Sequence, residues 1–336
     1  MPRRSPIGLR EISSLDTLAW AFWRASRGFQ ERPAVRSMGA DLDAELARLG
    51  ERLRAGAAPA GRWRRFTIHD PKRREILAPC FRDRVVHHAI LRHVGPVLER
   101  ALVDDTYACR PGRGTLAAVQ RAQEHLRRFP WFAKVDMRAY FASIDHGRML
   151  GVLERRFKNP SLVELFARIL ATAPVPAGRG LPIGALTSQH FANIYLDAVD
   201  RLLMERLRVR GMVRYMDDLI WWCDSGSQAR ETMRQVRAFA WTERQLDMKP
   251  GAYAGRSTQG VSFLGFRVMP GTLRLMRRRR RRYSAARARC EAEWRQGAID
   301  AVALQAGVDA ALAITAHADA RAWRTAELRR RPPVEA

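Results

Sequence analysis

Apolar residues recur at helical spacing over most of the 336-residue chain, and shorter apolar runs interrupt that spacing. The periodicity is longest over 185–208, where apolar side chains return every three or four residues. A helical and strongly basic tail is expected from residue 277 onwards. Helices are predicted over 14–30, 40–54, 82–101, 114–128, 146–157, 160–172, 185–208 and 227–245.

The short apolar runs between these helices have the length and composition of strands. Two of them, 212–216 and 219–223, flank the pair Asp217-Asp218, and this arrangement predicts a hairpin. Strands are predicted over 63–69, 75–78, 131–137, 212–216, 219–223, 261–268 and 272–276. Because strands and helices do not alternate regularly, the pattern indicates an α+β fold and not a doubly wound parallel sheet.

The charge balance changes this picture, because 60 lysines and arginines face only 34 aspartates and glutamates, for a net charge of +26. Such an excess is greater than solubility requires and predicts a polyanionic partner, most simply nucleic acid. An acidic membrane surface is the alternative. No apolar run reaches the roughly 18 residues of a membrane span, and no apolar signal core follows the basic N-terminus. We therefore expect no membrane contact and a cytoplasmic location.

The cysteines and lysines are few. The four cysteines are far apart in the sequence and form no CxxC pair, so reduced thiols are expected instead of a zinc site. Lysine can release a proton near neutral pH, whereas arginine cannot, so the few lysine positions are informative in a chain this rich in arginine. The lysines are Lys72, Lys134, Lys158 and Lys249.

Three aspartates are candidates for phosphoryl-transfer chemistry. Asp217 and Asp218 lie between apolar strands, where negative charge is costly without a nearby cation, although a solvated hairpin turn would also suit them. Asp136 ends an apolar run, so we expect it at a strand tip, with a helix N-cap as the alternative. Two-metal catalysis needs carboxylates from at least two segments. Asp217 is expected to be the main ligand of its pair, and Met137 to offer a backbone carbonyl.

The segment FAKVDMRAYFASIDH at 132–146 resembles the first catalytic motif of reverse transcriptases of the group II intron, retron and diversity-generating families. The segment RGLPIGALTSQHFANIYL at 179–196 resembles their second motif, and RYMDD at 214–218 resembles their third. The segment FLGF at 263–266 resembles their primer grip. DRVV and YACRPG, which precede these motifs in the sequence, resemble the fingers motifs, and the whole resemblance covers roughly residues 14–280.

This resemblance implies a right-hand polymerase with fingers, palm and a short helical thumb. We expect an N-terminal helical segment over 1–60, fingers over 61–130, a palm over 131–270 with a fingers insertion near 155–185, and a basic helical thumb over 271–336. The resemblance also implies two Mg²⁺ ions, with Mn²⁺ as the alternative metal. The implied metal ligands are Asp136, Met137, Asp217 and Asp218.

Further roles follow from the resemblance. Phe141 is expected to crowd the sugar 2′ position, a role that can coexist with core packing. Lys72 and Arg74 would clamp the triphosphate, with a solvated charge run as the alternative. Lys249 would protonate the pyrophosphate leaving group. The implied nucleotide-binding residues are Lys72, Arg74, Tyr140, Phe141, Ile183 and Gln189. The implied nucleic-acid-binding residues are Arg110, Phe263, Leu264, Gly265, Arg277, Arg278, Arg279 and Arg280.

The second motif distinguishes subfamilies. Many reverse transcriptases carry a glutamine where this chain has Ile183, and a Ser-Pro pair where it has Ser188-Gln189. This pattern resembles the enzymes of diversity-generating retroelements, which are bacterial or phage-encoded. Isoleucine cannot make the hydrogen bond that glutamine would, so the resemblance implies error-prone copying. The implied partners are a template-repeat RNA, the cDNA duplex, dNTPs and a small basic accessory protein.

Two other interpretations of the function stay open. A retron or defence-associated reverse transcriptase would keep the same chemistry in another biological setting. A non-catalytic RNA-binding protein on a polymerase fold would explain the charge of +26 equally well, but it predicts damaged acids, and all three aspartates are present.

Overall fold

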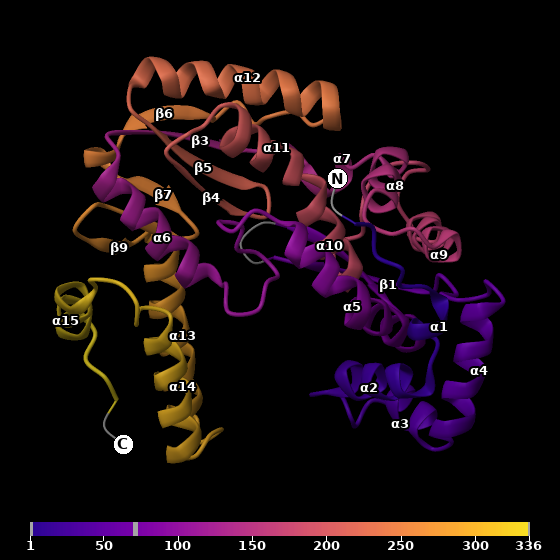
Figure 1. Ribbon diagram of the computed structural model, residues 1–336. Helices are drawn as coiled ribbons and strands as arrows, with labels where there is room; N and C mark the ends of the chain where they lie inside the picture. The colour runs from indigo at the N-terminus through magenta and orange to yellow at the C-terminus, as the bar shows by residue number, and fades with distance from the viewer. Residues whose placement is uncertain (1–2, 70–72, 335–336) are drawn as a thin grey trace.

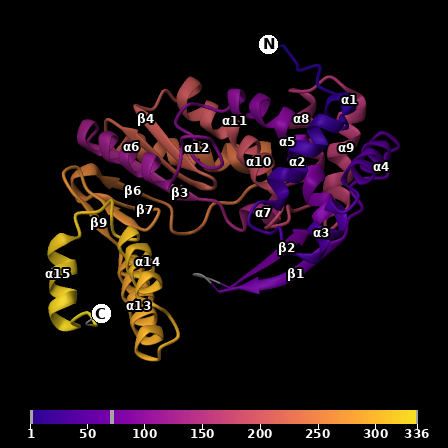
Figure 2. The ribbon, with the colours of Figure 1, turned by 90° about the horizontal axis from the view of Figure 1, so that it is seen from below.

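The computed structural model describes residues 3–69 and 73–334, and its N-terminal part is helical. A long helix, α5, is preceded by an antiparallel hairpin that runs along the edge of this helical region and points towards α13 and α14 (Figures 1 and 2). The elements are α1 (Leu9–Ile12), α2 (Leu15–Ser26), α3 (Pro33–Gly39), α4 (Leu42–Arg54), β1 (Trp63–Ile68), β2 (Arg74–Pro79) and α5 (Phe81–Ala101).

A four-stranded antiparallel sheet forms the centre of the molecule, in the order β4-β5-β3-β6. Its register pairs Asp136, the last residue of β3, with Asp218, the first residue of β5. Two of the three candidate aspartates are therefore neighbours at one end of the two inner strands. The strands are β3 (Trp131–Asp136), β4 (Gly211–Tyr215), β5 (Asp218–Cys223) and β6 (Tyr253–Arg256). The sequence pattern does not predict β6, because YAGR has no apolar run.

Helices cover both faces of this sheet, which is why β5 is apolar on both of its faces. Successive side chains of a strand point to opposite faces. Trp221 donates to Thr232 Oγ1 of α12 (Gly226–Arg244) at 2.9 Å. Trp222 packs on His125 of α6 (Thr115–Arg128), with ring centroids 4.8 Å apart. Figure 1 shows α12 lying along the sheet.

The segment between β3 and β4 is helical, as the sequence predicts, but it is more broken than expected. The single helix predicted over 185–208 is wrong, because the chain bends near Leu196 and ends in a π-helical stretch. This break places Asp200 and Asn193 on separate short elements. The elements are α7 (Tyr140–Ser143), α8 (His146–Glu154), α9 (Pro160–Ala171), α10 (Leu186–Tyr195), α11 (Asp197–Arg201) and the π-helix Leu202–Arg206.

The single strand predicted over 261–268 is also wrong, because the chain reverses at Leu264-Gly265, where both residues have positive φ. A three-stranded sheet results, from β7 (Val261–Phe263), β8 (Phe266–Val268) and β9 (Leu273–Leu275). It packs with α6 on a second apolar core that includes Trp222.

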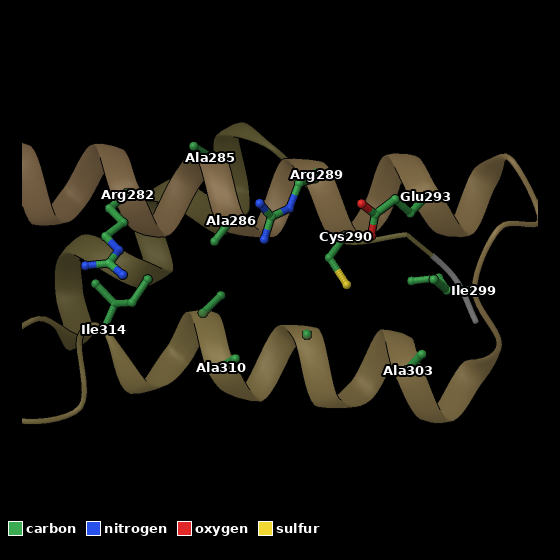
Figure 3. A pocket seen from close by; sticks show the side chains of 12 residues that line it. Arg282, Ala285, Ala286, Arg289, Cys290, Glu293, Ile299, Ala303, Ala310 and Ile314 are labelled. Atoms are coloured by element: carbon green, nitrogen blue, oxygen red, sulfur yellow. The ribbon is translucent and has the colours of Figure 1, made fainter. Parts of the chain in front are cut away.

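The basic tail forms three helices, α13 (Arg277–Arg295), α14 (Ala301–Ala313) and α15 (Arg321–Arg330), which project from the sheets (Figure 1). Between α13 and α14 lies a cavity of about 800 Å³ lined by five alanines and several larger side chains, and Arg289 and Cys290 point into it (Figure 3). Cys290 lies against Gly307, where any Cβ would clash with its sulfur. Among the described residues, no helix is long and apolar enough to cross a membrane.

Candidate active site

The three aspartates meet where β3 ends and the β4–β5 turn begins. Asp136 is the last residue of β3 and pairs in register with Asp218, the first residue of β5. Asp217 lies in the turn, after Met216, whose φ of +58° is in the left-handed region. The amide of Met137 donates to the carbonyl of Asp217 at 3.3 Å and so ties the turn to the end of β3. The structure thus brings together residues that are 81 positions apart.

Asp136 and Asp217 form the strongest electrostatic feature of this site. Burial, and then the negative charge of Asp136, raise the pKa of Asp217 to about 6. Asp136 Oδ1 is buried, and among the described residues no hydrogen-bond donor reaches it. A buried anionic oxygen without a partner is costly, and two carboxylates side by side repel each other. The pair is therefore arranged for a cation.

Two lysines form ion pairs in this site, Lys249 with Asp136 and Lys134 with Asp218. Lys249 Nζ lies 2.5 Å from Asp136 Oδ2, and the Lys249 amide donates to the Asp136 carbonyl at 2.8 Å. Lys134 Nζ donates to Asp218 Oδ1 at 2.6 Å and lies 5.2 Å from the ring centroid of Phe263. Burial raises the pKa of Asp218, and the charge of Lys134 opposes this effect.

Lys134 is the site residue to which sequence reasoning gave no role. Its signal was visible, since it is one of four lysines and lies two positions before Asp136 in the same strand. Residues at i and i+2 of a strand share a face, so Lys134 is directed to the side of the sheet that carries the candidate carboxylates.

The residues fit a magnesium site made of oxygens. Carboxylate oxygens are the ligands that Mg²⁺ prefers, and Asp136 and Asp217 supply them from two chain segments. In the described part of the chain, no three His, Cys, Asp or Glu side chains are grouped to hold a metal. This finding agrees with the position of Asp218, which is turned towards Lys134. The roles of Asp218 and the Met137 carbonyl as ligands stay predictions.

The predicted nucleotide-binding residues lie on neighbouring segments. Phe141 is half-buried, stacks edge-to-face on Tyr140 and accepts from the amide of Leu181 at 2.7 Å. Two residues further on, the carbonyl of Ile183 accepts from Leu77 of β2 at 2.8 Å. These backbone bonds link the segment after β3, the second motif and the β1–β2 hairpin.

Tyr140 and Gln189 have other contacts than a nucleotide. Tyr140 is buried, and its hydroxyl donates to the carbonyl of Ala192, which indicates a structural role. Gln189 is exposed and accepts from Cys109 Sγ at 3.4 Å. Arg74 is exposed at the start of β2. Lys72 lies outside the described residues, so the triphosphate clamp stays a prediction.

The Phe263–Phe266 turn is fixed by the basic tail. Arg279 stacks on Phe266, with its Cζ 4.0 Å from the ring centroid, and donates to the carbonyl of Leu264 at 3.4 Å. Gly265 has φ of +86°, and a Cβ there would lie 2.7 Å from Arg279 Nε. The positive φ of Gly265 and the close approach of Arg279 both favour glycine at this position. The hydrogen bond from Arg279 to the Leu264 carbonyl stabilises the turn.

The predicted nucleic-acid arginines divide into two groups. Arg277 and Arg278 are exposed at the start of α13, whereas Arg280 stacks on Trp323. The side chain of Arg110 is only 9% exposed, and Nη1 donates to three carbonyls of its own loop. Arg110 thus holds the loop, and its contact with nucleic acid stays a prediction.

These features define the α+β fold of a polymerase, with an acidic site at the tip of an antiparallel sheet. The sequence matches the reverse transcriptase (RNA-dependent DNA polymerase) family over residues 69–268, which is more than half of the chain. The chain therefore belongs to the reverse transcriptase family.

Two curated relatives agree with this assignment. Protein YkfC of Escherichia coli K12 is 27% identical over 172 residues, which cover 48% of this chain and 44% of YkfC. The group II intron-encoded protein LtrA of Lactococcus lactis subsp. cremoris is 24% identical over 140 residues, which cover 40% of this chain and 23% of LtrA. The matched part is thus less than half the length of either relative.

Among solved structures, apo telomerase from Candida tropicalis resembles this chain with a TM-score of 0.50 and 10% sequence identity. The match covers 78% of this chain and 58% of the telomerase chain. At this identity the similarity shows the fold alone.

Proposed function

We propose that the chain is an RNA-directed DNA polymerase that extends a primer on an RNA template. The observation that carries this proposal is the proximity of Asp136 and Asp217 on the fold of the reverse transcriptase family, with one carboxylate oxygen buried and reached by no hydrogen-bond donor among the described residues. In a merely solvated turn, that oxygen would face water.

Asp136 and Asp217 would hold Mg²⁺, which supplies charge stabilisation for the transferred phosphoryl group. Asp218 is anchored by Lys134 and keeps the turn in register with β3. Lys249 lies beside Asp136, within reach of the same site, and its ammonium can donate a proton to the leaving pyrophosphate.

The polymer substrate is proposed to lie between the hairpin and the basic helices. The β1–β2 hairpin points towards α13 and α14, and Arg277 and Arg278 are exposed at the start of α13 (Figure 2). We propose fingers over 61–130, a palm over 131–270 with an insertion near 155–185, and a thumb over 271–336, preceded by the helical segment 1–60. A net charge of +26 suits the phosphate backbones of a template–primer duplex.

Within the family we propose the diversity-generating retroelement type, with a template-repeat RNA and a small basic accessory protein as partners. The support is Ile183, whose carbonyl is fixed by β2, two residues from the bond between Leu181 and Phe141. An apolar side chain at this place offers no hydrogen bond to an incoming nucleotide, so discrimination is weaker there. A near-repeat in the flanking DNA that differs at adenine positions would support this type, whereas a retron RNA gene would contradict it.

Extension of a labelled DNA primer on an RNA template tests the activity. The wild type should extend with dNTPs and Mg²⁺, and Asp217→Asn should not. A wild type that binds the primed RNA but extends nothing, with its cognate RNA and accessory protein present, would instead support a non-catalytic RNA-binding protein.

A further inference from the structure

We infer that Arg214 is a positioning residue that fixes the carbonyl of Met216 and thereby aims the Asp217 carboxylate. The inference rests on the proposed function, because it concerns the same site. Arg214 lies in β4, three residues before Asp217, and neither its side chain nor that of Asp200 is exposed to solvent at all.

The guanidinium of Arg214 uses all five of its N–H donors. Nε and Nη2 donate to the Asp200 carboxylate at 2.6–2.8 Å. Nη1 donates to Asn193 Oδ1 at 2.7 Å, and Nη2 donates to the Asn193 carbonyl at 3.0 Å. The remaining Nη1 donor reaches the Met216 carbonyl at 3.0 Å. No donor is left for a group outside this network.

The bond to Met216 is the one with a consequence for chemistry. Met216 has a φ of +58°, a conformation that costs free energy in a residue with a side chain and persists only where the surroundings impose it. Its carbonyl belongs to the peptide that leads into Asp217. A fixed carbonyl therefore fixes the direction in which the Asp217 side chain leaves the turn.

The anchor itself cannot move easily. The Arg214 amide donates to the Asp105 carbonyl at 3.0 Å, and the Arg214 carbonyl accepts from Tyr107 at 2.9 Å. Asp200 also accepts from Thr106 at 3.3 Å, and Asn193 donates to the Ala108 carbonyl at 2.8 Å. The loop 105–108, α10, α11 and β4 thus converge on one buried cation.

Stability alone does not explain this arrangement. Desolvation of a buried ion pair offsets much of its attraction, and apolar residues of similar volume often replace such pairs without loss of stability. Burial raises the pKa of Asp200, while the charge of Asp200 raises the pKa of Arg214, so desolvation and attraction oppose each other in this pair. What apolar residues cannot replace is the donor to the Met216 carbonyl. Lysine, with three donors on one atom, cannot reproduce the planar five-donor pattern either.

The test compares two variants that remove the donor to Met216 in different ways. In Arg214→Met/Asp200→Leu both charged side chains are replaced by apolar ones. In Arg214→Lys the positive charge stays, but the planar guanidinium with its five donors is lost. Mn²⁺ binding is measured by electron paramagnetic resonance without nucleic acid, and kcat and KM are measured by primer extension. We expect at least tenfold weaker Mn²⁺ binding and a kcat more than tenfold lower, with the KM for primer–template unchanged.

The matched control is Arg287→Met/Glu291→Leu, which removes another buried pair, 2.9 Å long, within α13. It should leave Mn²⁺ binding unchanged. Wild-type Mn²⁺ affinity and kcat in both folded Arg214 variants would overturn the inference. So would a failure of both to fold, because the network would then be needed for folding and not separately for positioning. If the wild type extends no primer, the proposed function fails, while the Mn²⁺ measurement still decides the role of Arg214.

Discussion

Replacing Asp217 with asparagine should stabilise the metal-free protein above pH 6, although it should abolish polymerisation. Asparagine has nearly the same shape as aspartate, and it carries no charge at any pH. In the wild type, burial and the charge of Asp136 raise the pKa of Asp217 from its ordinary value of 3.8 to about 6. The folded state therefore favours the protonated carboxyl, and ionisation of Asp217 destabilises it.

The magnitude follows from linkage between protonation and folding. Each pKa unit is worth about 1.36 kcal/mol, so ionised Asp217 costs the folded state roughly 3 kcal/mol. This cost is absent below pH 3.8, grows as the pH rises towards 6, and is complete above it. For 336 residues at about 2.1 cal/mol/K each, the entropy of unfolding is about 0.7 kcal/mol/K. Asp217→Asn should therefore raise Tm by ~4 °C at pH 8 and by less than about 1 °C at pH 4.

Thermal unfolding in EDTA between pH 4 and pH 8 measures this difference. The control is Asp309→Asn, an exposed position in α14 where the side chain accepts from Gln305 and asparagine can still accept. It should not show the gain of ~4 °C at pH 8 that is expected of Asp217→Asn. Mg²⁺ should raise the Tm of the wild type at pH 8 and leave that of Asp217→Asn nearly unchanged. An Asp217→Asn variant no more stable than the wild type at pH 8 would refute the proposed repulsion.

Three further predictions concern the surroundings of the carboxylates. Lys134→Met removes the charge that opposes the raised pKa of Asp218, so the acidic limb of the pH–rate profile should move to higher pH; an unchanged profile would contradict the role of Lys134. Gly265→Ala places a Cβ 2.7 Å from Arg279 Nε at a φ of +86°, so it should destabilise the protein by about 1–3 kcal/mol and weaken primer–template binding, whereas Gly271→Ala, in open space, should do neither. Ile183→Gln should lower single-nucleotide misincorporation, and equal error rates in both proteins would remove the support for error-prone copying.

Much of this site can be read from the sequence, because its parts are local. Asp136 ends an apolar strand, and Asp217 lies between two more, so each is placed at a strand tip without knowledge of the fold. The resemblance to reverse transcriptases then predicts that the two tips meet. The register between β3 and β5, which makes Asp136 and Asp218 neighbours, confirms this proximity.

The parts that the sequence did not show depend on tertiary contacts. The break near Leu196 has no proline or glycine to mark it, and the apolar periodicity runs through it. The reversal at Leu264-Gly265 lies inside an apolar run, and it is stabilised by Arg279 from another element. The pairing of Lys134 with Asp218 requires the register between β3 and β5, which spans 84 positions.

The most direct test of the account is Mg²⁺-dependent primer extension on an RNA template by four proteins side by side. The wild type and Asp309→Asn should extend the primer equally, while Asp136→Asn and Asp217→Asn should each fall by at least about a thousandfold, because each removes one of two carboxylates from the site. A wild type that is inactive on its cognate RNA, or wild-type extension by either site variant, would contradict catalysis by Asp136 and Asp217.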